Sequence, residues 1–527
     1  MVQLTLPLAL IAATVVLAPV ADRIAVPYPV LLLILGLVLA FVPGLPVPSV
    51  NPDLILPLIL PPLLFAAARR TSWREFWDNR RAIGLLAVAL VGVTAFVVGA
   101  TLHALVPSVP LMAAIALGAA VAPPDPVTAT AVARKLRLPR RLRTILEGEG
   151  LVNDATALVL YGVAVSAAMT GVLAPWRAGA ELGVAVVVGI LAGLLVAVAA
   201  RWLLNRLPAH PAGSALVLVL PFAAYAAADA AHGSGVLAVV TVALALSRYG
   251  DAESSQTRLV SGTTWEIIEL VVTGAAFAYV GLALRSVALD IPGPVAGLIG
   301  QGLVITAVTI AVRFLWIFLV ATIDERTRQQ REVNAEPVGW REMTVASWAG
   351  MRGVVTMVAA IALPLGPPVF PERQRLIFIA FVVIIVTLVV QGLTLPLIVR
   401  RLGVSASDHD RDDAWQELLT RAREAGFRRL EELRNRGDVD ADTVDQAREN
   451  ADRMWHSMGF EARDGTDQQN AQTTENAVTV NALKNELLTA ARDAVVAARK
   501  ESGTDPTIVD LVLRRLDARG MQPEEGT

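Results

Sequence analysis

The sequence predicts an all-α, multi-pass membrane protein with about thirteen transmembrane helices, followed by a helical soluble tail. Of its 527 residues 55% are hydrophobic and only 17% are charged, whereas a soluble domain carries about 25% charged residues. Apolar runs of the length that crosses a bilayer recur up to Arg401 and then stop. The chain has no cysteine, which excludes disulfides, thiolate nucleophiles and cysteine-based metal sites.

Thirteen apolar runs, bounded by charged residues, Pro or Gly, are the predicted spans. The ninth run is short, and only His232-Gly233-Ser234 separates it from the eighth. The first run lacks a basic amino-terminal region and a small-residue cleavage site, so we interpret it as a span and not as a removable signal peptide. The runs lie near residues 2–21, 25–43, 50–68, 82–105, 109–133, 144–171, 179–204, 213–231, 235–248, 263–284, 294–322, 342–365 and 376–399.

Charge divides the chain after Arg401. Residues 402–527 contain 17 Lys and Arg against 26 Asp and Glu, a net charge of −9, which leaves a net charge of +7 for residues 1–401. We therefore predict a transmembrane domain over 1–401 and an acidic helical tail over 402–527. The tail lacks the basic clusters with interleaved aromatic residues that are typical of nucleic-acid binding, so no nucleic-acid partner is expected.

Lys and Arg are distributed unevenly between the two sides of the predicted membrane. The loops after odd-numbered spans, with the span ends beside them, contain 20 of these residues, and those after even-numbered spans contain 4. Basic loops stay in the cytoplasm. This predicts a cell-membrane protein with its N-terminus outside, its tail in the cytoplasm and an odd number of spans. For most of these basic residues, topology and contact with lipid headgroups are a sufficient explanation.

The fifth span contains one carboxylate among three prolines, in Ala122-Pro123-Pro124-Asp125-Pro126. Each proline removes a backbone donor and clashes with the preceding turn, so the helix should be interrupted here. Free carbonyls, that of Pro124 included, then flank Asp125, and such backbone is tolerated at membrane depth only where it lines a cavity or is buried in protein. We predict an ion-binding role for Asp125. A packing kink with a solvated carboxylate is the alternative.

Three polar residues, Glu149, Asn153 and Asp154, lie early in the sixth span. Glu149 and Asn153 are four residues apart and share one helical face, while Asp154 is rotated away from both. We therefore expect that one carboxylate is paired structurally while Asp154 stays available to a ligand. Capping of the helix by Asp154 is the alternative, although the apolar residues after Thr156 place it in the middle of the membrane.

Two arginines, Arg313 and Arg352, fall within apolar runs. A buried guanidinium without a counter-charge is very unstable, so each is expected to pair with an acidic group, with Glu149 as the leading partner. Arg313 could instead extend to an interface. Glycines on both sides of Arg352 predict a second interruption, in the twelfth span. Breaks in spans five and twelve, an odd number of spans apart, are typical of an inverted-repeat transporter with an ion site at the midplane.

The oxygen atoms around the first break suit a hard monovalent cation. Protons compete for the same carboxylates, because desolvation favours the neutral form of a carboxyl group. Competition at one site, combined with alternating access, is sufficient for antiport. If Glu149 stays paired, Asp154 alone changes charge, and exchange of one Na⁺ for one H⁺ would be electroneutral. The candidate ligands are Asp125, Asp154, Asn153, Thr128 or Thr156, and the Pro124 carbonyl.

These motifs resemble those of cation/proton antiporter family 1, which includes NhaP-type bacterial sodium/proton antiporters and animal sodium/proton exchangers. The resemblance covers most of residues 1–400, and its specific part is Glu149-x-x-x-Asn153-Asp154 together with Arg352-Gly353. Further matches are Pro61-Pro62-Leu63-Leu64-Phe65, Asp125-Pro126-Val127, Ser234-Gly235-Val236-Leu237-Ala238 and Gly350 to Gly353.

The resemblance implies a homodimer in which a core domain (spans 4–6 and 11–13) moves as an elevator against a dimerisation domain (spans 1–3 and 7–10). It implies exchange of Na⁺ or another alkali cation for H⁺ at Asp125 and Asp154, in pH and sodium homeostasis and without a resident cofactor. It also implies that Glu149 is a structural salt-bridge partner, and that Asn153-Asp154 accompanies electroneutral exchange.

Three positions depart from the pattern of the family. Pro124 and Gly150 stand where many relatives carry hydroxyl side chains, and Ala66 replaces an acidic residue after Phe65. With these oxygen atoms missing, transport of K⁺ or Li⁺ stays open, and a K⁺/H⁺ antiporter is the first alternative. A gated cation channel would need a selectivity-filter loop, and a sensor that signals through its tail is a third possibility. The chain lacks a nucleophile–base set and an H-E-x-x-H motif, so an enzyme is not predicted.

Overall fold

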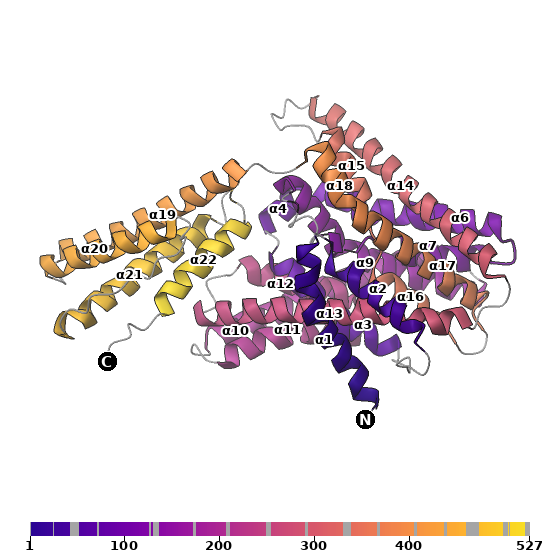
Figure 1. Ribbon diagram of the computed structural model, residues 1–527, viewed down its shortest axis with the longest axis horizontal. Helices are drawn as coiled ribbons and strands as arrows, with labels where there is room; N and C mark the ends of the chain where they lie inside the picture. Colours follow the sequence, from indigo (N-terminus) through magenta and orange to yellow (C-terminus); the bar gives the residue numbers. More distant parts are fainter. Residues whose placement is uncertain are drawn as a thin grey trace. The chain divides into compact units, whose positions relative to one another are not determined.

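The computed structural model is built of helices, and no strand occurs in the residues that it describes (Figure 1). This confirms the predicted fold class. The structure describes residues 2–24, 26–42, 52–70, 73–125, 128–129, 136, 138–171, 175–206, 211–248, 255–289, 294–329, 339–365, 369–404, 408–436, 440–459, 474–498, 504 and 506–521.

The chain divides into two compact units. Unit 1 comprises Met1–Arg206, Ala215–Arg248 and Ser261–Ser405, and unit 2 comprises Leu207–Ser214, Tyr249–Val260 and Ala406–Thr527. Each unit has its own hydrophobic interior, and each is described by itself below.

In the first 402 residues each of the thirteen apolar runs corresponds to a helix or to consecutive shorter helices. A short helix, α4 (Trp73–Asp78), precedes the fourth run. The helices are α1 (Val2–Arg23), α2 (Tyr28–Ala40), α3 (Pro52–Arg70), α5 (Arg80–Gly84) continued by the π-helical η1 (Leu85–Leu90) and α6 (Val91–Leu105), α7 (Leu111–Val121), α9 (Arg140–Thr170), α10 (Pro175–Leu204), α11 (Pro211–Ala230), α12 (Gly235–Arg248), α13 (Ser255–Leu289), α14 (Val295–Gln329), α15 (Trp340–Trp348), α16 (Val354–Ile361), and α17 (Arg373–Val386) continued by the π-helical η3 (Thr387–Gln391) and α18 (Gly392–Leu402).

Seven helices in the described ranges are long and apolar enough to cross a membrane, and four shorter apolar helices accompany them. The chain is thus a multi-pass membrane protein. The total of thirteen crossings stays a prediction.

Both predicted interruptions are present. Helix α7 ends at Val121, directly before the prolines 123 and 124, whose nitrogens cannot donate to a helix. The twelfth run is divided into α15 and α16, and Gly353 before α16 is extended, with φ −133° and ψ −152°. Of the residues that follow Asp125 in the fifth run, Thr128 and Ala129 are helical, and most of the others lie outside the described residues.

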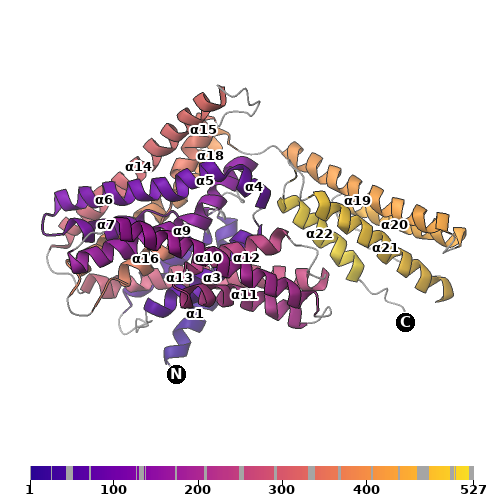
Figure 2. The ribbon, with the colours of Figure 1, turned by 180° about the vertical axis from the view of Figure 1, so that it is seen from behind.

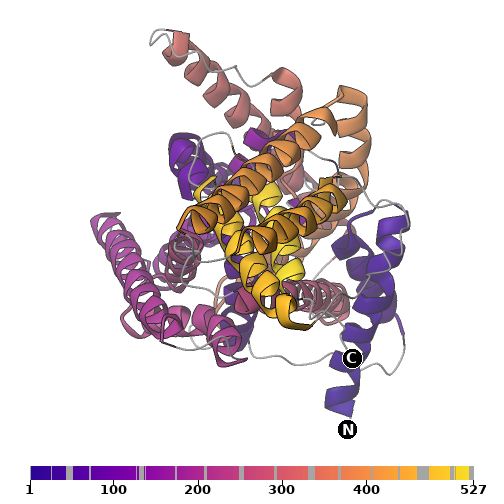
Figure 3. The ribbon, with the colours of Figure 1, turned by 90° about the vertical axis from the view of Figure 1, so that its left-hand side faces the viewer.

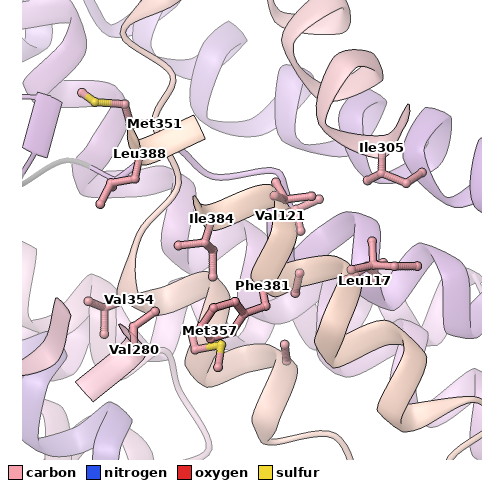
Figure 4. Close-up of a cluster of buried hydrophobic side chains, with 14 of the residues drawn as sticks. Leu117, Val121, Val280, Ile305, Met351, Val354, Met357, Phe381, Ile384 and Leu388 are labelled. Carbon is pink, nitrogen blue, oxygen red and sulfur yellow. The ribbon is translucent and has the colours of Figure 1, made fainter. Parts of the chain in front are cut away.

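The broken helices are packed tightly into unit 1. Helices α6 and α7 lie side by side (Figure 2), as do α14 and α17 (Figure 1). Between α7, α16 and α17 the side chains of Val121, Met357, Phe381 and Ile384 gather into one buried cluster (Figure 4). Because lipid is as apolar as these side chains, close packing and not the hydrophobic effect holds such helices together.

The tail folds into four helices, α19 (Asp408–Arg436), α20 (Ala441–Gly459), α21 (Thr474–Ala498) and α22 (Pro506–Met521), which pack against one another as a bundle (Figure 3). Its interior is aliphatic, and no large hydrophobic side chain is exposed on its described residues. Inside it, Arg492 Nε lies 2.8 Å from Asp517 Oδ1. On its surface, hydrogen bonds from Arg429 to Glu486 and Glu432 raise the pKa of the Arg429 guanidinium.

Candidate functional site

The two broken helices meet at their interruptions. The backbone N–H of Asp125 donates to the carbonyl oxygen of Met351 at 2.6 Å. Gly353 lies so close that a Cβ at this position would be 2.6 Å from the carboxyl carbon of Asp125. Only glycine permits this approach of backbone to side chain. The glycine that favours the second break therefore also creates the space for the carboxylate of the first.

Asp125 is buried, and one of its oxygens is fixed by local structure. Its Oδ2 accepts a hydrogen bond from the backbone N–H of Thr128 at 2.9 Å. This is the bond of a helix-capping carboxylate, because the first N–H groups of a helix have no partner within it. The side chain that the sequence predicts as a ligand therefore also accepts a backbone hydrogen bond at the first break.

The helix α9 is bonded directly to the first break. Asn153 Nδ2 donates to the carbonyl oxygen of Pro124 at 3.2 Å. Asn153 is fully buried, and the neighbouring Asp154 is 1% exposed. Asp154 and Asp125 interact electrostatically with each other. The polar residues of the fifth and sixth runs therefore belong to one site.

Three oxygen atoms of this site are buried without a hydrogen-bond partner among the described residues: Thr128 Oγ1, Asn153 Oδ1 and Asp154 Oδ2. Burying such atoms unpaired costs about 1–3 kcal/mol each, so they fit a ligand that needs oxygen donors. Thr156 differs, since it is half-buried and its hydroxyl donates to the Val152 carbonyl of its own helix at 3.3 Å.

Glu149 is engaged on both oxygens by one arginine. Arg313 Nη1 lies 2.5 Å from Glu149 Oε1, and Arg313 Nη2 lies 2.9 Å from Oε2. Arg313 also donates to the carbonyl of Ala346, from Nε at 3.3 Å and from Nη2 at 3.2 Å. Both side chains are 1% exposed, so Arg313 does not extend to an interface. This bidentate geometry is the one that stabilises a buried ion pair.

Arg352 binds backbone carbonyls instead of a carboxylate. Its Nε donates to Val121 at 2.9 Å, its Nη2 to Ala122 at 3.2 Å, and its Nη1 to Gly350. Within the described part of the chain no hydrogen bond or ion pair joins Arg352 to Glu149, the partner expected from the sequence. The reason is geometric: the end of α7 offers carbonyls with partial negative charge and no helical partner, while Arg313 already occupies Glu149.

Sequence reasoning missed one participant, Thr387 in η3. Its hydroxyl accepts a hydrogen bond from the Arg352 backbone N–H at 3.1 Å and donates to the Val383 carbonyl at 2.8 Å. The signal was present, because Thr387 is a polar residue in the middle of an apolar run. A single threonine in such a run is common, however, since its hydroxyl can bond to its own helix.

The charges of the buried side chains can be counted. Glu149 and Arg313 form an ion pair, and the other charged side chains buried in the described part of unit 1 are Arg352, Asp125 and Asp154. With both aspartates ionised, these three side chains have a net charge of −1. A single monovalent cation or a single proton would balance that charge.

Comparison with known proteins identifies the family of the chain. The family described as "Sodium/hydrogen exchanger, transmembrane" matches residues 9–401. A protein of Mycobacterium tuberculosis called an uncharacterized Na⁺/H⁺ exchanger is 33% identical over 520 residues, which cover 97% of this chain and 93% of the relative. A "Sodium, potassium, lithium and rubidium/H(+) antiporter" of Bacillus pumilus is 35% identical over 71% of this chain and 58% of its own length.

A solved structure shares the fold. The sodium proton antiporter MjNhaP1 of Methanocaldococcus jannaschii superposes with a TM-score of 0.57 at 17% identity, covering 76% of this chain and 98% of that one. The family match extends over most of unit 1 and includes every residue of the site. The resemblance recognised in the sequence is confirmed, and the chain belongs to the sodium/hydrogen exchanger family.

Proposed function

We propose that this protein is a secondary antiporter that exchanges Na⁺ for H⁺ by alternating access and serves pH and sodium homeostasis. The observation that carries the proposal is that oxygen atoms of Thr128, Asn153 and Asp154 are buried without a hydrogen-bond partner in the described residues, next to the two helix breaks. Carboxylate, amide and hydroxyl oxygens are the ligands of hard cations. The family is one of transporters, and no enzymatic role is proposed.

In this mechanism Asp154 is the group that exchanges its ligand. In one state it holds the cation together with Asn153 and Thr128, and in the other it holds a proton. Asp125 contributes charge and fixes the break, and the Pro124 carbonyl positions Asn153. Thr156 stays a candidate ligand, because its hydroxyl donates its hydrogen to the Val152 carbonyl and its oxygen keeps lone pairs for a cation.

Exchange is proposed to be electroneutral, one Na⁺ for one H⁺. The support is the charge count, since Glu149 is locked to Arg313 and the remaining site carries one uncompensated negative charge. A protein that binds one cation or one proton at this site moves the same charge in both directions. Neither direction then depends on the membrane potential.

The organisation of the protein is proposed from the same residues. The site draws on the fifth, sixth, eleventh, twelfth and thirteenth runs, which supports a moving core of spans 4–6 and 11–13 within residues 1–401. Spans 1–3 and 7–10 would form the dimerisation domain of a homodimer in the cell membrane. The excess of Lys and Arg in the loops after odd-numbered spans supports an N-terminus outside the cell and a cytoplasmic tail over 402–527.

A K⁺/H⁺ antiporter is the second candidate. The Bacillus pumilus relative is named for potassium, lithium and rubidium as well as sodium. In this chain Pro124 and Gly150 also lack the hydroxyls that many family members place at the site. Fewer protein ligands would leave a larger share of the coordination to water and would weaken discrimination by ion size.

Reconstituted vesicles test the proposal. Proteoliposomes with an acidic interior and a trapped pH dye should lose their pH gradient on external addition of Na⁺, and a voltage clamp should leave the rate unchanged. Additions of Li⁺ and K⁺ rank the cations. Asp154→Asn should abolish the response, while the control Asp229→Asn, which neutralises an exposed carboxylate on α11, should retain it. Full exchange by D154N would refute the assigned role of Asp154.

A further inference from the structure

Arg373, the first residue of α17, binds the end of the broken half-helix α16. Its Nε donates to the Leu363 carbonyl at 2.8 Å, and its Nη2 donates to the Ile361 carbonyl at 2.7 Å. The last carbonyls of a helix have no partner within it, and they carry the negative end of the helix dipole. A guanidinium fork at this point satisfies two carbonyls and places a positive charge where the helix favours one.

The opposite end of α16 is the ion site. Helix α16 begins directly after Gly353, the residue in contact with the carboxyl group of Asp125. It has only 8 residues, so it is a short link with Arg373 at one end and Asp125 at the other. We expect a displacement of the C-terminal end of α16 to reach the carboxylate of Asp125, because this short helix has no kink or loop between its two ends.

The turn that presents Arg373 is held in an unusual conformation. Glu372 has φ 51° and ψ 29°, in the left-handed region that residues other than glycine rarely adopt. Its carboxylate accepts hydrogen bonds from the Ser108 hydroxyl at 3.1 Å and from Arg375 Nε at 3.0 Å. Such strain persists only where the surroundings fix it. Here the surroundings are the α6–α7 connection and the first turn of α17.

Arg373 also faces the second helix of the site. It interacts electrostatically with Tyr161 of α9, whose hydroxyl is buried without a hydrogen-bond partner in the described residues. Tyr161 follows Asp154 by seven residues and therefore lies on the same face of α9, two turns away. Arg373 thus adjoins α9, which carries Asp154, and the end of α16, whose start lies against Asp125.

We propose that Arg373 is a positioning residue for cation binding: it holds the C-terminal end of α16 by two hydrogen bonds and so keeps Gly353 against Asp125. The inference rests on the proposed antiport function. It assigns Arg373 no contact with the ion. Its contribution is to hold Asp125 in the geometry in which the site binds a cation, so its loss should weaken cation binding more than it slows turnover.

The test compares three variants in proteoliposomes, with KM for Na⁺, maximal rate and Tm measured for each. Arg373→Gln should raise KM about tenfold, because two charge-assisted hydrogen bonds are replaced by weaker ones. Arg373→Lys keeps the charge but loses the planar fork, so its KM should rise about threefold. Arg400→Gln removes a charge at an exposed position of α18, and its KM should stay within about twofold of that of the wild type.

The outcomes separate this inference from the proposed function. Wild-type protein that shows no cation-dependent proton flux would refute the antiport function itself. Active wild type with an unchanged KM in R373Q and R373K would overturn the inference. A fall in both maximal rate and Tm of R373Q without a change in KM would also overturn the inference, because a residue with only a structural role has that effect. An R400Q variant as impaired in KM as R373Q would also overturn it. Because R373K keeps a cation at the helix end, it preserves the test if R373Q folds poorly.

Discussion

Asn153 donates its side-chain amide to the carbonyl of Pro124, so the helix that carries Asp154 is bonded directly to the break that carries Asp125. This bond leaves the amide oxygen of Asn153 as an acceptor without a partner in the described chain. One side chain therefore has two functions. Its nitrogen holds the two elements together, and its oxygen is available to a cation.

Asn153→Ala should weaken cation binding. The substitution removes one hydrogen bond and one candidate ligand, worth about 1 kcal/mol each, so KM for Na⁺ should rise by roughly ten- to thirtyfold. The measurement is the concentration dependence of proton flux in vesicles. Asn205→Ala, at an exposed position after α10, is the control and should leave KM unchanged. An N153A variant with wild-type KM would remove Asn153 from the ligand set.

Gly353→Ala should abolish transport. A Cβ at residue 353 would lie 2.6 Å from the carboxyl carbon of Asp125, closer than any normal contact. Either Asp125 or the start of α16 must then move. The matched control is Gly84→Ala, because nothing lies within 4 Å of a Cβ at that helical position. G84A should transport normally. Comparable activity in the two variants would show that the break tolerates expansion.

Glu149→Gln should destabilise the protein without entering the exchange chemistry. Removing one partner of a buried ion pair costs about 3–5 kcal/mol, because the other charge is left uncompensated. Thermal unfolding in detergent should show a lowered Tm for E149Q. The double variant Glu149→Gln with Arg313→Met should recover part of the loss. Independent, additive effects of the two substitutions would argue against the coupling seen in the structure.

Gln391→Leu should stabilise the protein. Gln391 ends the π-helical segment η3, is 1% exposed, and has neither Oε1 nor Nε2 paired with a described residue. An apolar side chain of similar size avoids the cost of burying these atoms, about 1–3 kcal/mol. Thr387→Val, in the same segment, removes a hydroxyl with two hydrogen bonds and should lower Tm. A fall in Tm for Q391L would indicate that the amide is bonded in the folded protein.

The isolated tail should fold on its own. Helices α19–α22 share a closed core and expose no large hydrophobic side chain on their described residues. A fragment that spans residues 402–527 should be soluble and helical by circular dichroism, with a single cooperative unfolding transition. Asp517→Asn, which weakens the buried pair with Arg492, should lower its Tm. An unstructured fragment would contradict the division into units.

The sequence predicts those parts of the site that local chemistry determines. The prolines around Asp125 and the glycines on both sides of Arg352 are helix-breaking residues that stand close together, so the residue types indicate both breaks. Such residues do not break every helix, since Pro57, Pro61 and Pro62 lie inside α3. Apolar runs likewise predict where the helices lie. The tail is recognisable from its charge and from its helical periodicity.

The sequence cannot reveal pairings that depend on how the helices pack. Glu149 is a candidate partner for two arginines, and only the tertiary structure shows that Arg313 of α14 is the one paired with it. Arg352 instead binds the carbonyls of Val121 and Ala122, and backbone carbonyls carry no signature in a sequence. The π-helical turn at Thr387 is not predictable either, because it differs from an α-helix by one residue in its hydrogen bonding.

The hydrogen bonds from Arg352 to the end of α7 bear on how the protein can change conformation. Arg352 lies in the chain between α15 and α16, and its guanidinium donates hydrogen bonds to backbone carbonyls at the end of α7. Separating the two interrupted helices would leave this buried positive charge without those hydrogen bonds. We therefore expect the two interrupted helices to stay together during transport. In the proposed antiport, access to the site would then change sides by a movement of these helices as one body relative to the rest of the transmembrane domain.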